Sequence, residues 1–203
     1  MSKFIRFTWS AILVMALFVL GILLADKLWL RENVIRLRVV AASDKAEDQE
    51  RKLLVRDAVT GYLQTAMENT PDAIAAKNYL AGQLDVLQEL ATAVLRKEGS
   101  RESVTVYLTE ENTPSRVYDT FRLPSGVYET LHVDIGAAQG ENWWCVVFPS
   151  LCIPVTTEGF RAAAAGAGFD SGLTDSLSET EGFEIRFFFL DCLGKLEEFL
   201  FPA

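Results

Sequence analysis

The stretch of the chain that most limits its possible folds is Gly140–Pro154, which reads GENWWCVVFPSLCIP. Its central run, Trp143–Phe148, places apolar side chains on both faces of an extended strand. Such a strand is typical of the middle of a sheet, where other elements cover both faces. The stretch has no histidine and no charged residue after Glu141, which indicates a core motif and not a reaction centre. The residues assigned to this core motif are Asn142, Trp143, Trp144, Phe148 and Pro149.

Two cysteines of this stretch, Cys145 and Cys152, can form a disulfide only if the chain reverses between them. In one straight strand they would lie about 23 Å apart at about 3.3 Å per residue, which is too far for a bond. Pro149 lies between them and suits a turn. Cysteines that face each other directly would require a cis bond before Pro149, whereas a looser turn would leave two packed thiols. We predict the disulfide, which leaves Cys192 unpaired.

The N-terminus carries a targeting signal. Lys3 and Arg6 precede an apolar run, Trp9–Ala25, which at about 1.5 Å per residue is just long enough to span a bilayer. The basic end stays in the cytoplasm, so the rest of the chain is expected to be exported. Residues 1–25 are therefore either an uncleaved membrane anchor or a signal peptide that is removed. Residues 26–33 are predicted to form a short tether.

Charge and motifs exclude several function classes. The chain has 19 basic and 28 acidic residues, a net charge of −9 at pH 7. This argues against a nucleic-acid partner, because neutralising phosphates requires clustered Lys and Arg. The chain has no glycine-rich phosphate loop, nucleophile elbow or HExxH motif. We therefore predict no cofactor and no small-molecule substrate.

The hydrophobic patterns predict an α+β fold in which a helical hairpin packs on a small mixed or antiparallel sheet. Residues 34–154 form its core domain. The first strand lies within Asn33–Ala42, with Arg36 and Arg38 alternating outward. A second, Val127–Ile135, is expected to form a hairpin with the Trp143–Phe148 strand. Glu129 falls on the apolar face of that second strand and needs a partner, for which the two arginines are candidates.

Two helices should form the hairpin, one from Asp44 to about Glu68 and one over residues 70–99. Asp44 and Glu47 fit a capping box at the start of the first helix. The start of that helix is polar nearly all round, yet Asp48 and Lys52 lie on its core-facing side. These two residues either overhang the core into solvent or form a half-buried ion pair used in recognition. The candidate partner contacts are Asp48, Gln49, Lys52 and Arg56.

The C-terminal third changes composition. Residues 155–182 are rich in Thr, Ser, Ala and Gly and are predicted to be a flexible connection, with at most a short helix at Glu158–Ala165. Residues 183–203 have apolar residues at helical spacing and predict a helix that docks on the core. The main alternative is a strand over Phe183–Phe189 followed by a helix. Insertion into a membrane surface is disfavoured, because the opposite face carries acids such as Glu197 and Glu198.

The single histidine, His132, raises the question of catalysis. With Asp134 nearby and Cys145 on a neighbouring strand, a nucleophilic set is conceivable. The alternation of the strand, however, places His132 and Asp134 on its polar face, whereas Cys145 lies in an apolar run. One histidine with two cysteines that bond to each other is also a poor metal site. We therefore predict neither a catalytic centre nor a metal site.

Two segments resemble a known family. The first comprises Leu37–Asp44, Asp48, Gln49, Lys52 and Val55–Val59. The second comprises Leu123–Gly126, Tyr128–Leu131, Gly140, Asn142–Val146, Phe148, Pro149, Leu151 and Cys152. Over roughly Val34–Pro154 the chain resembles stage II sporulation protein R of endospore-forming bacteria. One departure is Ser150, which stands where members of that family often have a second proline.

The resemblance implies a signalling protein and no enzyme. Such a protein would be made in the forespore and exported into the space between the two membranes, where it remains anchored or is released. There it would activate a membrane-bound aspartic-type protease of the mother cell, which processes the precursor of sigma-E. An extracytoplasmic structural or envelope-binding module is the alternative, and a Cys/His hydrolase is a remote one.

Overall fold

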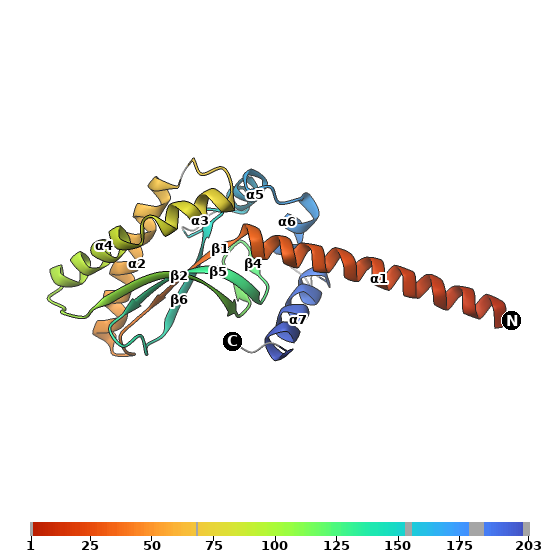
Figure 1. Cartoon of the computed structure of the whole chain (residues 1–203), viewed down its shortest axis with the longest axis horizontal. Helices are drawn as coiled ribbons and strands as arrows, with labels where there is room; N and C mark the ends of the chain where they lie inside the picture. The colour runs from red at the N-terminus through yellow and green to blue at the C-terminus, as the bar shows by residue number, and fades with distance from the viewer. Residues whose placement is uncertain (1, 68, 153–155, 179–184, 201–203) are drawn as a thin grey trace.

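The computed structural model of the chain describes residues 2–67, 69–152, 156–178 and 185–200. It confirms the α+β class and has a four-stranded sheet and a separate two-stranded one (Figure 1). The helices are α1 (Ser2–Asn33), α2 (Ala46–Ala66), α3 (Ala73–Ala81), α4 (Leu84–Lys97), α5 (Thr157–Gly166), α6 (Ser171–Leu177) and α7 (Ile185–Leu200). The strands are β1 (Ile35–Val40), β2 (Val104–Thr113), β3 (Arg116–Val117), β4 (Arg122–Leu123), β5 (Gly126–Ile135) and β6 (Asn142–Phe148).

The main sheet has the strand order β2-β5-β1-β6. β1 runs parallel to β5 and antiparallel to β6, so it separates the two strands that were expected to form a hairpin. That hairpin prediction is wrong because the connecting loop crosses the end of β1 instead of turning back on β5. Gly140 N donates to Ala41 O at 3.0 Å and Glu141 N donates to Asp44 Oδ1 at 2.7 Å. As a result, β6 lies at the edge of the sheet.

The first core lies between the sheet and the helices α2, α3 and α4, which cover one of its faces (Figure 1). Its members alternate along the strands as the period of two requires; they include Leu37, Val39, Leu131, Val133 and Cys145. Glu129 also lies on this face and pairs with Lys77 of α3. The prediction that Arg36 or Arg38 would pair with Glu129 is therefore wrong, because both arginines lie on the opposite face of the sheet.

The predicted helical hairpin differs in detail from the structure. α2 begins after Lys45, which has no side-chain cap, so the expected capping box at Asp44 does not form. The Asp44 carboxylate instead accepts the loop N–H of Glu141. The second predicted helix is divided into α3 and α4 by a break at Gly82 and Gln83, and Asp72 caps α3 by accepting Ala75 N at 2.8 Å.

α1 is one continuous helix that leads directly into β1 (Figure 1). Its first part stands away from the body and exposes its apolar side chains, and Phe4–Asn33 has the length and composition to cross a membrane. Its last turns are part of the folded domain, since Leu23 and Leu30 are buried in the second core. The expected tether at residues 26–33 is therefore wrong: these residues are helical, and the apolar side chain of Leu30 fixes them to the sheet.

The second core lies on the other side of the sheet and joins α1, the β3–β4 hairpin, α5, α6 and α7. Phe160 of α5 and Leu173 and Leu177 of α6 are buried in it. The short helix expected at Glu158–Ala165 is confirmed by α5. The described part of the expected flexible connection, 156–178, is instead two capped helices. Each has a pair of buried apolar side chains four residues apart, Phe160 and Ala164 in α5 and Leu173 and Leu177 in α6, which supply a packing face.

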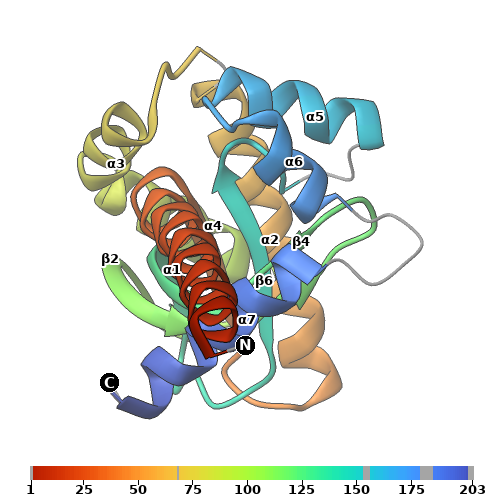
Figure 2. The ribbon, with the colours of Figure 1, turned by 90° about the vertical axis from the view of Figure 1, so that its right-hand side faces the viewer.

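α7 docks on the turn that precedes β5. The predicted C-terminal helix is confirmed, and the alternative of a strand is wrong for the described residues from Ile185 onward. Ser125 Oγ donates to Asp191 Oδ1 at 2.8 Å, and Ser125 N donates to the same oxygen at 3.0 Å. Lys27 Nζ of α1 donates to Leu193 O at 3.0 Å. Gly194 allows the close approach, since a Cβ atom there would overlap Ser125 O. Figure 2 shows α7 crossing the base of α1.

The close approach at Gly194 generates a first prediction. Gly194→Ala should lower the free energy of unfolding by about 1–3 kcal/mol, because the added methyl group forces α7 away from Ser125. Gly61→Ala in α2 is the matched control: it meets nothing within 4 Å and should gain about 1 kcal/mol from helix propensity. Urea unfolding of both variants in detergent measures the difference. Equal stability of the two variants would contradict this packing.

Candidate interaction groove at the sheet edge

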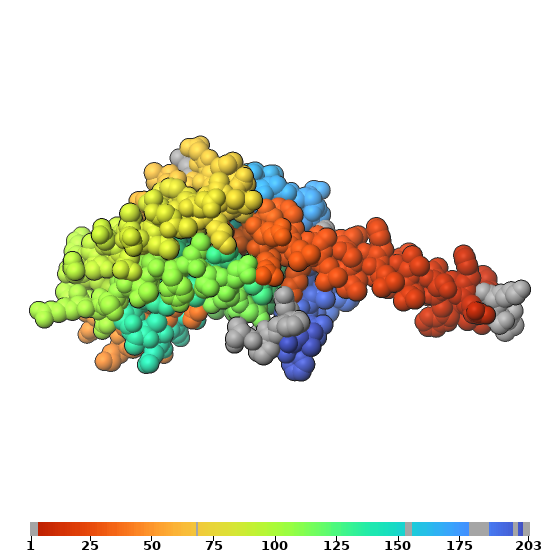
Figure 3. Space-filling view, viewed as in Figure 1, coloured from red at the N-terminus to blue at the C-terminus, as the bar shows by residue number. Residues whose placement is uncertain are grey.

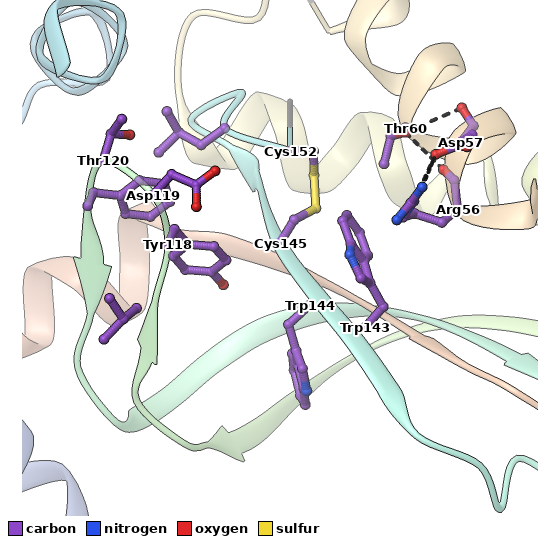
Figure 4. A pocket seen from close by; sticks show the side chains of 13 residues that line it. Arg56, Asp57, Thr60, Tyr118, Asp119, Thr120, Trp143, Trp144, Cys145 and Cys152 are labelled. Atoms are coloured by element: carbon purple, nitrogen blue, oxygen red, sulfur yellow. Dashed lines mark hydrogen bonds and ion pairs between the residues drawn. A yellow bond between two sulfur atoms is a disulfide. The ribbon is translucent and has the colours of Figure 1, made fainter. Parts of the chain in front are cut away.

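A groove of about 460 Å³ opens beside β6, between α2 and the turn that connects β3 to β4 (Figure 4). Its walls come from three parts of the chain that are distant in sequence. α2 supplies Arg56, Asp57 and Thr60; the β3–β4 turn supplies residues 117–121; β6 and the segment after it supply Trp143, Trp144, Cys145, Leu151 and Cys152. The groove combines aromatic surface with a few charged side chains, a composition typical of protein-binding sites.

The disulfide fixes one end of this groove. Cys145 and Cys152 are joined with their Cα atoms 5.0 Å apart, and the peptide bond before Pro149 is cis. Leu151 N donates to Val146 O at 3.0 Å, so the chain reverses between the two cysteines as the predicted disulfide requires. Cys192 is a free, exposed thiol on α7.

β6 presents one backbone edge to the groove. Because Val146 O accepts from Leu151 N, that carbonyl points away from β1. Successive residues of a strand direct their backbone groups to opposite sides, so Trp144 and Asn142 also direct N–H and C=O away from β1. No other strand of the described chain flanks β6 on this side. An extended peptide can add to such an edge as a further strand.

The two tryptophans of β6 lie on opposite faces of the strand. Trp143 packs under Arg56, whose guanidinium carbon is 5.2 Å from the ring centroid. Trp144 packs against Arg36 and Arg38, at 4.7 Å and 5.5 Å. Both rings are only partly buried, unlike Phe148, and Asn142 is exposed. The predicted central strand is therefore an edge strand, whose apolar faces are covered by arginine side chains as well as by the core.

Arg36 was expected to point outward, and this prediction is wrong: its exposed fraction is 0%. Its guanidinium lies over Trp144 and, at 5.6 Å, over Tyr128, while Nη1 donates to Pro114 O at 3.1 Å and to Thr113 Oγ1. No carboxylate of the described chain forms an ion pair with it, and burial lowers the pKa of Arg36. Aromatic rings thus stabilise this buried cation in place of an acid.

Of the four candidate partner contacts, Arg56 alone lines the groove. Lys52 is buried, and its Nζ donates to Glu141 O at 3.0 Å and to Gln49 Oε1 at 2.6 Å; burial lowers the pKa of Lys52. Asp48 accepts from Ser43 Oγ at 2.6 Å. Both interpretations of Asp48 and Lys52 are therefore wrong, since Lys52 neither overhangs into solvent nor pairs with Asp48.

Gln49 completes this arrangement by donating through Nε2 to Ser43 O at 3.0 Å. Asp48, Gln49 and Lys52 thus hold the loops at the end of β1 and the start of β6. The sequence spacing placed them on the inner side of α2 correctly. It carried no sign of the backbone carbonyls of Ser43 and Glu141 that they would meet there.

His132 lies on the face of the sheet opposite to Cys145, so the conceivable nucleophilic set is not assembled. The His132 ring stacks on Tyr107 at 4.5 Å, and its Nε2 is 3.2 Å from Glu111 Oε1. Glu111 also pairs with Arg38 at 3.2 Å. Burial and a hydrogen bond to Asp134 raise the pKa of Tyr107 to about 12. Within the described residues, no group of three or more potential ligands could hold a metal ion.

The sequence interpretation missed the β3–β4 turn as part of the groove. Tyr118 and Phe121 stack at 4.5 Å, and Phe121 is buried against Phe160. Burial raises the pKa of the Tyr118 hydroxyl. Tyr118 and Phe121 are two aromatic residues in a short polar segment, and this pattern could have indicated that the turn packs against another part of the domain.

These features define a small α+β domain with an open sheet edge beside an aromatic groove, attached to an apolar N-terminal helix. The chain belongs to the stage II sporulation protein R family, whose sequence model matches residues 31–158. It is 33% identical over 121 residues to Stage II sporulation protein R of Bacillus subtilis (strain 168). These aligned residues make up 60% of this chain and 54% of that protein. The aligned part thus spans about half of the relative's length. No solved structure matches.

A second prediction concerns the cysteines. Without reductant, a thiol reagent should modify Cys192 alone; after denaturation and reduction it should also modify Cys145 and Cys152. Mass spectrometry of the intact chain counts the modified sites. Cys145→Ser should lower the free energy of unfolding by about 2–3 kcal/mol, whereas the control Cys192→Ser should not. Full modification without reductant would contradict the disulfide.

A third prediction concerns Glu111. Burial alone would raise its pKa, but the hydrogen bond and charge of His132, together with Arg38, outweigh burial and hold the pKa of Glu111 below its usual value. A carboxylate with a depressed folded pKa adds stability above the unfolded pKa, and this stability is lost as the pH falls through the folded value. Glu111→Gln should therefore lose less stability on acidification than the wild type.

Urea unfolding at neutral pH and at about pH 3, below the usual pKa of glutamate, measures this loss. Glu98→Gln, a change at an exposed residue after α4, should keep the acid sensitivity of the wild type. The same acid dependence in Glu111→Gln and wild type would show that the cluster around His132 adds no pH-dependent stability.

Proposed function

We propose that this sporulation protein is an exported signal that activates a membrane-bound aspartic-type protease, which in turn processes the sigma-E precursor. Membership of the stage II sporulation protein R family supports the sporulation role. The observation that carries the proposal is the open groove beside β6, which offers backbone groups, tryptophan rings and the Arg56 side chain to a protein partner. The partner is the extracytoplasmic part of the protease.

Activation by contact requires a surface that holds a segment of the protease in one conformation. The outward N–H and C=O groups of Trp144 can pair with an extended segment, and such pairing gives affinity that is independent of the segment's sequence. The side chains along the walls give selectivity: Arg56, which also pairs with Asp57 at 2.7 Å, lies on one side of the groove, and Asp119 lies on the other. A segment with matching charges would be held in one register.

We also propose that α1 is retained as an anchor and that the domain lies outside the cytoplasm. The apolar part of α1 that precedes the domain is exposed over most of its surface, as a lipid-facing helix requires. Removal of residues 1–25 would take Leu23, which is 6% exposed, out of the second core. Cleavage would therefore cost the domain part of its packing, whereas retention of α1 preserves it.

The fourth prediction tests the signalling function and the role of the groove. Cells produce the chain together with the protease and the sigma-E precursor, and shortening of the precursor is followed on gels. Arg56→Glu and Asp119→Arg, on opposite walls of the groove, should each reduce processing about 10-fold, the effect of about 1.4 kcal/mol of lost binding. Arg101→Glu, an exposed charge reversal outside the groove, should leave it unchanged. Thermal unfolding checks that all three variants fold.

The outcomes separate the two parts of the proposal. If the wild-type chain does not promote precursor processing, the signalling function is wrong. If the wild-type chain does promote processing, and both groove variants promote it to the same extent as Arg101→Glu, the function stands and the groove is not the contact surface.

A further inference from the structure

We propose that α7 is a membrane-surface helix: its outward apolar face lies in the headgroup region of the leaflet from which α1 emerges. The inference rests on the proposed function in one respect, which is that α1 stays in the membrane. It assigns lipid as the occupant of a surface that the described residues leave uncovered. The argument combines the composition of this face, the rigid docking of α7 and its direction relative to α1.

The outward face of α7 is almost entirely apolar. It consists of five large side chains with exposed fractions of 45–81%; they are Phe188, Phe189, Leu196, Phe199 and Leu200. At about 100° per residue they fall within an arc of about 120° on the helix surface. Cys192 lies inside this arc and Lys195 lies at its margin. Exposed apolar patches of this kind mark surfaces that bind protein or membrane.

The inner face of α7 is fixed to the domain, so the outward face has one direction. Leu190 is buried, and the Asp191 carboxylate accepts two hydrogen bonds from Ser125. Burial would raise the pKa of Asp191, but its bonds to Lys195 and Ser125 hold it below its usual value, which keeps this contact ionised at neutral pH. Lys27 Nζ joins α1 to the backbone of α7 at Leu193 O. α7 therefore cannot turn its apolar face inward.

The direction of α1 sets where the bilayer lies. In Figure 1, α1 extends away from the body and α7 runs across the direction of α1 where the two helices meet. Figure 2, the view along α1, again shows α7 extending sideways from the base of α1. A bilayer crossed by α1 along its length therefore contains α7 close to its surface plane. This is the position of an amphipathic interfacial helix.

The contacts between the two helices set the depth. Phe189 lines one apolar groove together with α1 residues from Ala11 to Leu23. On the other side, Leu196 and Leu200 line a second apolar groove, of about 330 Å³, whose other wall includes Leu24 and Leu28 of α1. Leu24 and Leu28 lie around the end of the apolar run of α1, where a spanning helix leaves the hydrocarbon, whereas the groove beside Phe189 extends along the run itself. On the face shown in Figure 3, the outer part of α1 extends beyond the body of the domain.

The acidic charge of the chain does not oppose this position. A free interfacial helix needs basic residues because attraction to anionic lipids helps to hold it at the surface. α7 is held at the bilayer by α1, so its local concentration there is already high. Lys195, at the margin of the apolar arc, pairs with Asp191 of the same helix at 2.7 Å, so this margin needs no counter-charge from lipid or from a protein.

The fifth prediction uses the full-length chain in phosphatidylcholine nanodiscs. Cys192→Ser removes the free thiol, and single cysteines are introduced for a nitroxide label in place of Phe199, Leu196, Lys97 and Val14. Oxygen concentrates in the hydrocarbon and a neutral nickel chelate in water, so the ratio of their collision rates with each label reports its depth. Labels at positions 199 and 196 should favour oxygen at least about 3-fold relative to position 97, which lies at the far end of α4.

The label at position 14 separates this inference from the proposed anchor, because it lies on the exposed part of α1. If position 14 favours oxygen and positions 196 and 199 behave like position 97, α1 spans the bilayer and the inference about α7 is wrong. If position 14 is in water, the retained anchor is wrong and the inference fails with it. If positions 196 and 199 are shielded from both reagents and their spectra broaden with protein density, a second copy covers α7, which also overturns the lipid assignment.

Discussion

The structure depends on the position of β1 between β5 and β6. Parallel pairing with β5 and antiparallel pairing with β6 bury β1 on both edges, and the two cores cover it on both faces. This one insertion moves β6 to the edge of the sheet and sends Arg36 into the interior. It also sets the last turns of α1 against the sheet, because only Val34 separates α1 from β1. The groove, the buried arginine and the direction of the N-terminal helix all follow from that pairing.

The burial of Arg36 explains the position of one aromatic side chain of the groove, Trp144. A guanidinium without an acid nearby is stable in the interior only if other groups replace part of its hydration. Trp144 and Tyr128 provide ring faces, and the chain around Thr113 provides oxygen atoms. Trp144 thus has two tasks, since it stabilises the buried cation on one side and lines the groove on the other. The core motif and the interaction surface are therefore parts of one arrangement.

The sequence predicted local features well and long-range ones poorly. Periodicity located β1, β5, β6, α2 and α7, because it depends on which residues share a face. It could not show that β1 lies between β5 and β6, since strand order depends on contacts between distant segments. For the same reason, Arg36 was expected in solvent although its alternation along β1 was correct. Lys52 was placed on the inner side of α2, but its acceptor, Glu141 O, belongs to a loop that only the assembled fold brings there.

The direct junction of α1 with β1 has a mechanical consequence. A domain on a flexible linker could present its groove in any direction. It would then lose this rotational freedom when a partner binds. Here α1 and the central strand β1 form one rigid unit, and the contact of α7 with α1 supports it from the side. With α1 in the membrane, as proposed, the position and direction of the groove relative to the bilayer are set when the domain folds. A partner in the same membrane would meet the groove in a fixed orientation. Binding would therefore cost the domain little rotational entropy.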